Sequence, residues 1–277
     1  MIQDLLSIHA SDWQRQYPER VLALPYLDPV RRDALVAYAA IAGQWQDDVD
    51  GIRETAVLEA KFAWWAEELA LSRRGESRHP LSKALFQLPA ASDLPEALWL
   101  APLEAGLARR EAPPVADFAA QMAAFEPFQR ALARLETALW FASAADATRA
   151  TRVGVLGHIA AILPRIGHAN ASDVLPMNLL ARHGLSLDGL AETTPARTAA
   201  LRDQLQTLQS AAFDAISLPG PLSLFASASW RASRQRLAQA LRAADPVVEL
   251  ATAIRPGFRL AWQVWRDARR LRRHYRF

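Results

Sequence analysis

Apolar residues recur every three or four positions along almost the whole chain, and no stretch alternates apolar and polar residues in the manner of a β-strand. Leu58, Phe62, Trp65 and Leu69 are one example, because residues at this spacing share one face of an α-helix. Ala, Leu, Arg, Glu and Gln, which are strong helix formers, dominate the sequence. The pattern predicts an all-α fold.

Proline-containing breaks divide this helical pattern, because proline cannot continue the interior of a helix. The breaks delimit about ten helices, which we expect at residues 11–18, 29–48, 56–73, 80–88, 95–110, 115–142, 148–166, 196–216, 221–243 and 246–273. The sequence has no internal repeat, and its 51% hydrophobic content is ample for a buried core. We therefore expect residues 1–277 to form a single domain.

The composition narrows the class of protein. The chain has no cysteine, which rules out disulfides and thiolate chemistry. Its first residues, MIQDLLSIHASDWQRQ, lack the basic region and apolar run of a signal peptide. The most apolar segment, residues 153–163, is too short to cross a bilayer. We expect a cytoplasmic protein, either free or peripheral at the inner face of the membrane.

Positive charge is concentrated at the C-terminus. Eight arginines and one aspartate give residues 255–277 a net charge of +7, whereas the whole chain carries +3. The rest of the chain is therefore acidic, which argues against a nucleic-acid-binding protein. The basic tail favours a local anionic partner instead.

An acidic cluster follows the helical segment at residues 29–48. Asp47, Asp50 and Glu54 are spaced at i, i+3 and i+7, so they share one face if the helix continues. Carboxylates at this spacing suit a Mg²⁺–diphosphate site, because Mg²⁺ binds one or two carboxylates together with substrate phosphates. A solvated helix end explains the same residues.

Several short motifs follow one another along the chain in a characteristic order. They are LPYL with VRR at residues 24–32, KxxWWxEEL at 61–69, His79-Pro80, and LPxxLLxRHGL at 175–185. Their order and spacing resemble the squalene/phytoene synthase family of head-to-head prenyltransferases over roughly residues 15–190. The resemblance implies an isoprenoid-synthase fold in which helices surround a central cavity.

The resemblance also implies a chemistry. In this family two opposed acidic motifs hold Mg²⁺ ions, which bind the diphosphates of two prenyl substrates. The metals are needed because the departing diphosphate develops negative charge that must be neutralised. Mg²⁺ is therefore expected here only if the protein is an enzyme.

The acidic motifs of the family are incomplete in this chain. Gln46 stands where the first motif should begin with aspartate, and the usual upstream arginine is replaced within Ile41-Ala42-Gly43. Residues 147–172, where the second motif should lie, contain no Asp or Glu. They carry Pro164, which should kink the helix, and the basic residues Arg149, Arg152, His158, Arg165 and His168. The nearest substitute carboxylates are Glu104, Glu136 and Asp173.

These departures favour a protein without synthase activity. The segment PERVLALPYLDPVRRDALVAYAA resembles the branch of the family that lacks the acidic motifs, which includes mitochondrial proteins that assist assembly of respiratory complex I. We expect a non-catalytic protein that binds an isoprenoid or other lipid, or an assembly-type protein. The alternative is an active prenyltransferase that condenses two prenyl diphosphates head-to-head through Asp47, Asp50 and Glu54.

A second group of residues is a candidate for the cavity wall. It comprises Trp45, Trp99, Trp140, His158 and Arg165. Tryptophan rings in such a cavity would stabilise carbocations by cation–π contact, although large aromatics at helical spacing are more often part of the core. Histidines without nearby carboxylates are more often packing residues than metal ligands.

The C-terminal helix, expected within residues 246–277, is basic and amphipathic. Trp262 and Trp265 lie on an apolar stripe with Phe258, and four arginines flank it: Arg266, Arg269, Arg270 and Arg273. Such a helix is typical of binding to an anionic membrane surface or to a protein partner. It is equally typical of a terminal helix that packs on the body with its arginines in solvent.

Overall fold

The computed structural model describes residues 11–111, 113–141, 145–167 and 174–275. Over these residues the chain forms helices and no β-strand, which confirms the all-α prediction. The longer helices are α3 (Pro29–Gly51), α4 (Thr55–Arg73), α7 (Glu96–Ala108), α8 (Phe118–Trp140), α9 (Thr148–Ile162), α11 (Pro195–Ile216), α12 (Leu224–Ala240) and α14 (Phe258–Leu271).

Shorter elements connect them. They are α2 (Pro18–Val21), α5 (Pro80–Leu85), α6 (Pro89–Asp93), α10 (Met177–Arg182) and α13 (Pro246–Ala251), together with the 3₁₀ turns η1 (Leu24–Tyr26), η2 (Arg109–Glu111), η3 (Leu163–Arg165) and η5 (Asp188–Ala191). Residues 11–16 are also helical. None of the helices in the described ranges is both long and apolar enough to cross a membrane.

Local sequence signals start the main helices. The carboxylate of Asp28 accepts hydrogen bonds from the backbone N–H groups of Val30 and Arg31, and Pro29 occupies the first helical position of α3. Asp117 caps α8 and Thr194 caps α11 in the same way. These caps explain why the predicted starts of the helices lie within a few residues of the observed ones.

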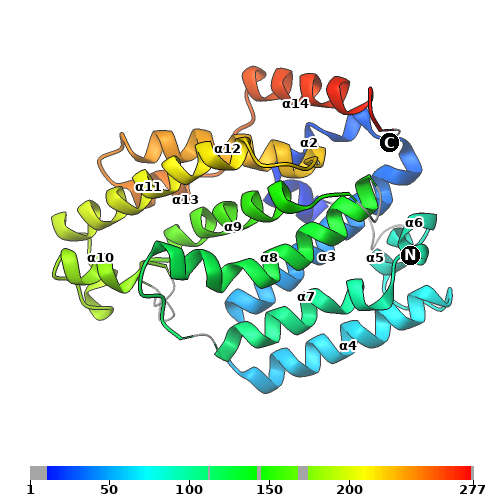
Figure 1. Cartoon of the computed structure of the whole chain (residues 1–277), viewed down its shortest axis with the longest axis horizontal. Helices are drawn as coiled ribbons and strands as arrows, with labels where there is room; N and C mark the ends of the chain where they lie inside the picture. Colours follow the sequence, from blue (N-terminus) through cyan, green and yellow to red (C-terminus); the bar gives the residue numbers. More distant parts are fainter. Residues whose placement is uncertain (1–10, 112, 142–144, 168–173, 276–277) are drawn as a thin grey trace.

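The helices form layers around a middle pair (Figure 1). α8 and α9 pack against each other, with α3 beside α8. α4 and α7 cover one side of the bundle, α11 and α12 cover the other, and α14 lies outermost on α12. Two hydrophobic clusters fill the interior, and α8 and α12 contribute residues to both of them.

One predicted helix is wrong. The segment 246–273 forms two helices, α13 and α14, separated by residues 252–257. Pro256 disfavours helical geometry at Arg255, and Gly257 becomes the N-cap of α14. The break turns α14 so that it lies along α12 as a separate element.

Candidate functional site

The end of α3 faces the end of α9 through a group of polar side chains. We call Gln46, Asp47, Asp50, His158 and Arg165 the α3–α9 polar cluster. The Asp50 carboxylate lies 3.3 Å from a guanidinium nitrogen of Arg165 and 3.6 Å from Nε2 of His158. Asp47 lies 4.0 Å from the same guanidinium. The sequence identified all five residues as candidates or departures, and the fold brings them together.

His158 is neutral in this environment. The pKa of His158 is lowered to about 4, chiefly by burial and also by the positive charges of Arg109 and Arg165, whereas Asp50 opposes the shift. Its Nε2 is buried without a hydrogen-bond partner. The 3.6 Å contact with Asp50 therefore joins a neutral ring to a carboxylate, and is not an ion pair at neutral pH.

The remaining members of the cluster also have partners. Burial raises the pKa of Asp47, and the side chain of Gln16 donates a hydrogen bond of 3.4 Å to its carboxylate. Gln129 on α8 donates a hydrogen bond to the side chain of Gln46. The guanidinium of Arg165 thus faces both carboxylates, the amide of Gln16 bonds to Asp47, and the amide of Gln129 bonds to Gln46.

Aromatic and basic side chains from neighbouring helices complete the surroundings of His158. The ring of Phe125 lies edge-on to the imidazole with the centroids 4.6 Å apart. The Arg109 guanidinium stacks over the Phe125 ring, 3.6 Å from its centroid. Sequence reasoning missed Phe125 and Gln129, whose apolar or amide character gave no signal.

Two neighbouring acidic residues lie outside the cluster, and one of them, Glu54, belonged to the predicted metal site. Asp48 faces away from the cluster and forms an ion pair of 2.6 Å with Lys61 on α4. α3 ends at Gly51, and Glu54 is an exposed residue at the N-cap of α4. The prediction that Glu54 shares a helical face with Asp47 and Asp50 was therefore wrong. The Arg110 side chain donates a hydrogen bond to the carbonyl of Ile52 in the connecting turn.

The substitute carboxylates that lie in the described residues, Glu104 and Glu136, are not part of the α3–α9 polar cluster. Glu104 is exposed on α7. Glu136 is half-buried on α8 and accepts a hydrogen bond of 2.5 Å from Ser223. Asp173 and His168 lie outside the described residues. Within those residues, no group of three or more His, Asp or Glu side chains is close enough to hold a metal ion.

The three tryptophans proposed for a cavity wall belong to one of the two hydrophobic clusters, the one that includes residues of α3, α4 and α7. Trp45, Trp99 and Trp140 are fully buried there. Trp45 packs edge-on against Trp65, and the Trp99 indole donates a hydrogen bond to the carbonyl of Ala91. Their contacts in the structure are core contacts, and a role in binding a ligand stays a prediction.

α14 has two apolar faces. Leu260, Val264 and Ala268 are buried against the body. Asp267 fixes the helix by accepting two hydrogen bonds from Arg231 on α12, at 2.8 and 2.9 Å, and one from Ser227. The helix is thus held firmly on the molecule.

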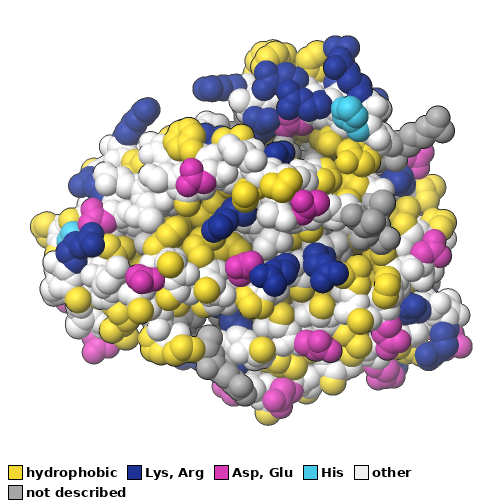
Figure 2. All heavy atoms as spheres, viewed as in Figure 1, with side chains coloured by type: hydrophobic (Ala, Val, Ile, Leu, Met, Phe, Trp, Pro, Cys, Tyr) yellow, Lys and Arg dark blue, Asp and Glu magenta, His cyan; other side chains and the backbone are white. Residues whose placement is uncertain are grey.

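The second apolar face of α14 points outward. Trp262 is 46% exposed and Trp265 37% exposed, and Phe258 is more exposed still. The guanidinium groups of Arg266 and Arg269 stack over the two indoles, each 5.0 Å from a ring centroid. Figure 2 shows apolar side chains beside a concentration of Lys and Arg side chains over this part of the molecule. Packing on the body and exposure of the tryptophans therefore occur in the same helix.

Two solved structures have a fold similar to that of this chain. A crystal structure of a dehydrosqualene synthase in complex with a ligand aligns with a TM-score of 0.72 at 13% identity, covering 99% of this chain and 98% of its own. The squalene synthase HpnC from Alicyclobacillus acidocaldarius aligns with a TM-score of 0.62 at 17% identity, covering 87% and 94%. At these identities the similarity shows the fold alone.

The sequence itself shows the family. No curated protein matches the chain significantly. The model of the squalene/phytoene synthase family, however, matches residues 14–266, which is most of the chain. That match agrees with the isoprenoid-synthase fold of the two solved structures. The chain belongs to the squalene/phytoene synthase family.

Proposed function

We propose that this protein is a non-catalytic member of its family, one that binds an isoprenoid or other lipid or acts in assembly without condensing prenyl diphosphates. One observation carries the proposal: the carboxylate of Asp50 faces Arg165 and a neutral His158, and the described residues contain no group of three or more His, Asp or Glu side chains that could hold a metal ion. The family chemistry needs opposed acidic groups to hold Mg²⁺.

The donor set of the α3–α9 polar cluster does not fit a Mg²⁺–diphosphate site. Mg²⁺ requires hard oxygen ligands, for which imidazole is a poor substitute. Arg165 supplies one positive charge 3.3 Å from Asp50, which offsets only one of the two carboxylate charges. Without metals, Asp47 and Asp50 would repel an incoming diphosphate. Loss of the metal clamp removes a stabilisation of the leaving group worth several kcal/mol.

The alternative is an active head-to-head prenyltransferase. In that case Asp47 and Asp50 would be Mg²⁺ ligands, and Arg165 would move to the substrate diphosphate, to which a guanidinium binds well. The family membership and the two remaining carboxylates support this alternative.

A product assay separates the two. We expect that pure protein incubated with farnesyl or geranylgeranyl diphosphate and Mg²⁺ gives no squalene- or phytoene-type product. In calorimetry, the unreactive analogue farnesyl thiodiphosphate should bind equally with and without Mg²⁺ if the protein retains an isoprenoid site. Turnover that is abolished by Asp50→Ala and retained by the control Asp93→Ala would overturn the proposal and establish the prenyltransferase.

We further propose that the outer face of α14 docks the protein on an anionic membrane. The outward tryptophans supply apolar insertion, and the surrounding arginines supply attraction. Each arginine near such a surface contributes about 1 kcal/mol. Since the Leu260, Val264 and Ala268 face holds the helix on the body, docking would require no unfolding.

Liposome sedimentation tests this docking. Binding to vesicles that contain anionic lipid should be strong at low salt, weaker at high salt, and absent for neutral vesicles. Trp262→Ala/Trp265→Ala should lose most of it, as should conversion to Gln of four arginines, namely Arg266, Arg269, Arg270 and Arg273. The matched control converts to Gln four exposed arginines elsewhere, namely Arg53, Arg74, Arg182 and Arg242. Equal binding by control and test variants would exclude docking through α14.

A further inference from the structure

A groove on the surface lies away from the α3–α9 polar cluster. It has a volume of about 590 Å³ and runs between α8 and the first half of α9, with Leu218 beyond the end of α11 at one side. No member of the polar cluster lines it. Neither the motifs of the family nor the candidate residues found in the sequence account for this groove.

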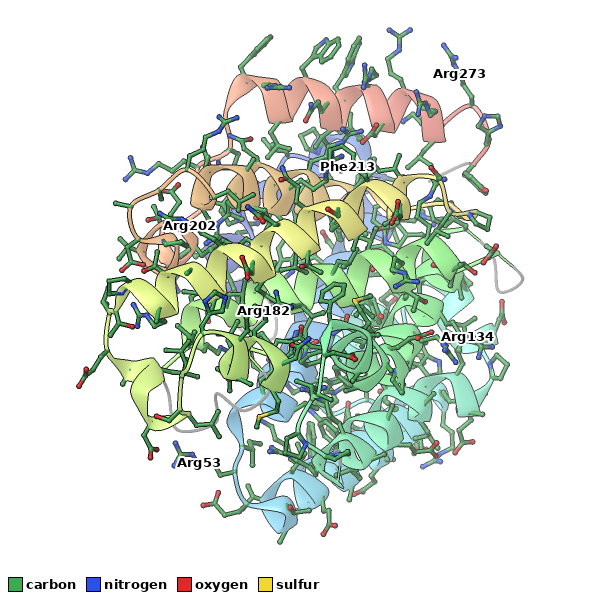
Figure 3. All side chains as sticks on the ribbon, turned by 60° about the vertical axis from the view of Figure 1, so that its left-hand side comes forward. Arg53, Arg134, Arg182, Arg202, Phe213 and Arg273 are labelled. Atoms are coloured by element: carbon green, nitrogen blue, oxygen red, sulfur yellow. The ribbon has the colours of Figure 1, made fainter. Side chains whose placement is uncertain are left out.

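Three arginines from two helices line the groove. Arg130 and Arg134 come from α8, and Arg152 comes from α9. Arg130 forms an ion pair with Glu126 one turn earlier. Arg134 and Arg152 are exposed, and they have no hydrogen bond or ion pair with any other residue in the described part of the chain. Figure 3 shows Arg134 at the outer side of the bundle.

The acidic residues at the groove are already engaged. Glu126 is paired with Arg130. Asp146 accepts a hydrogen bond of 2.8 Å from the backbone N–H of Thr148, and hydrogen bonds from the side chain and the backbone of Thr148 lower the pKa of its carboxyl. The three arginines outnumber the two acidic residues, so the lining of the groove carries a net charge of +1.

The wall of the groove adds a buried polar group. Thr151 is only 8% exposed, lines the groove, and has no hydrogen bond from its hydroxyl in the described structure. Met122 and Val155, both buried, supply apolar surface beside it. The hydroxyl of Thr151 is not among the buried side-chain atoms that lack a hydrogen-bond partner, so it is accessible from the groove, where it can donate to a ligand.

We propose that this groove binds a phosphate or diphosphate group, with Arg134 and Arg152 contacting its oxygens and Thr151 donating a hydrogen bond from the wall. Guanidinium groups match the geometry of phosphate oxygens and bind them by charge-assisted hydrogen bonds. The apolar surface of Met122 and Val155 accommodates the carbon part of a phosphate ester. The ligand is either a soluble phosphate ester or the head group of a phospholipid.

Calorimetry on the full chain tests the site. The probes are inorganic diphosphate for the soluble source and monomeric dihexanoyl phosphatidic acid for the lipid source, both without Mg²⁺. We expect at least one to bind at low salt. Arg134→Gln/Arg152→Gln should weaken that binding at least tenfold, whereas the control Arg53→Gln/Arg242→Gln, which removes the same charge from exposed sites, should leave it within twofold.

Two further variants make the test specific. Thr151→Val preserves the shape of the side chain and should weaken binding severalfold while the melting temperature stays near that of the wild type. Asp50→Asn changes the polar cluster and should leave the affinity unchanged, so the outcome is independent of the proposed loss of synthase activity. The inference is overturned if neither probe binds, or if the Arg134/Arg152 and Arg53/Arg242 variants bind equally well.

Discussion

Burial keeps the imidazole of His158 uncharged in the folded protein, since desolvation lowers its pKa to about 4 from a usual value of 6.5. In the unfolded chain the ring is hydrated and titrates near 6.5. Between pH 6.5 and 4 the unfolded state therefore binds more protons than the folded state. The free energy of unfolding should fall as the pH is lowered through this window.

The contribution of His158 can be isolated by substitution. A shift of this size corresponds to about 3 kcal/mol at most, lost progressively below pH 6.5. Burial also raises the pKa of Asp47 and Glu136, which acts in the opposite direction. Denaturant unfolding should therefore be compared for the wild type and His158→Gln between pH 7.5 and 5. The wild type should lose more stability than the variant, and parallel losses would show that His158 is not buried as described.

Sequence reasoning found the residues of the polar cluster but not their contacts. Asp47 and Asp50 were recognisable because their carboxylates are spaced for a Mg²⁺ site, and His158 and Arg165 because they are basic residues in a segment where the family is acidic. Their pairing depends on how α3 packs beside α9, which no local pattern encodes. Glu54 was misplaced for a similar reason: α3 ends at Gly51 and Glu54 becomes the N-cap of α4, whereas the i+7 spacing assumes that the helix continues.

At the scale of helices, Gly106 lets α7 pack closely against α3 and α4. A Cβ added at Gly106 would lie 2.7 Å from a ring carbon of Phe62 and 2.8 Å from a methyl carbon of Val49. Both neighbours are buried, so neither can move freely. Gly157 on α9 has nothing within 4 Å of such a Cβ, which makes it a matched control in another helix.

The two glycines should therefore respond oppositely to alanine. Gly106→Ala gains up to about 1 kcal/mol of helix propensity, but overpacking costs about 1–3 kcal/mol, so its melting temperature should fall. Gly157→Ala should raise the melting temperature, because only the propensity gain applies. A stabilised Gly106→Ala would contradict the close packing of α7 against Phe62 and Val49.

The starts of helices were predicted correctly where a cap residue and a proline mark them. The buried face of α14 was not predicted, because it depends on packing against another helix. Asp28-Pro29 and Thr194-Pro195 fixed the starts of α3 and α11. In α14, Leu260, Val264 and Ala268 form one apolar stripe, and Phe258, Trp262 and Trp265 form another. The sequence favoured the aromatic stripe as the single apolar face. Only the surface of α12 determines which of the two is buried.

At the scale of the whole molecule, the fold is that of isoprenoid synthases, whereas the end of α3 meets a guanidinium and a neutral imidazole. The family resemblance predicted the helical architecture. It could not predict which side chains meet at the end of α3, because that depends on three-dimensional contacts. The α14 face and the groove at α8 and α9 lie outside the chemistry of the family, and both carry excess positive charge.

A crystal structure of the protein grown with Mg²⁺ and farnesyl thiodiphosphate tests the central claim most directly. We predict that Asp50 keeps its contacts with Arg165 and His158 and that no Mg²⁺ is bound between Asp47, Asp50 and a diphosphate. Mg²⁺ ions coordinated by both aspartates and by the diphosphate oxygens, with Arg165 displaced from Asp50, would contradict the claim.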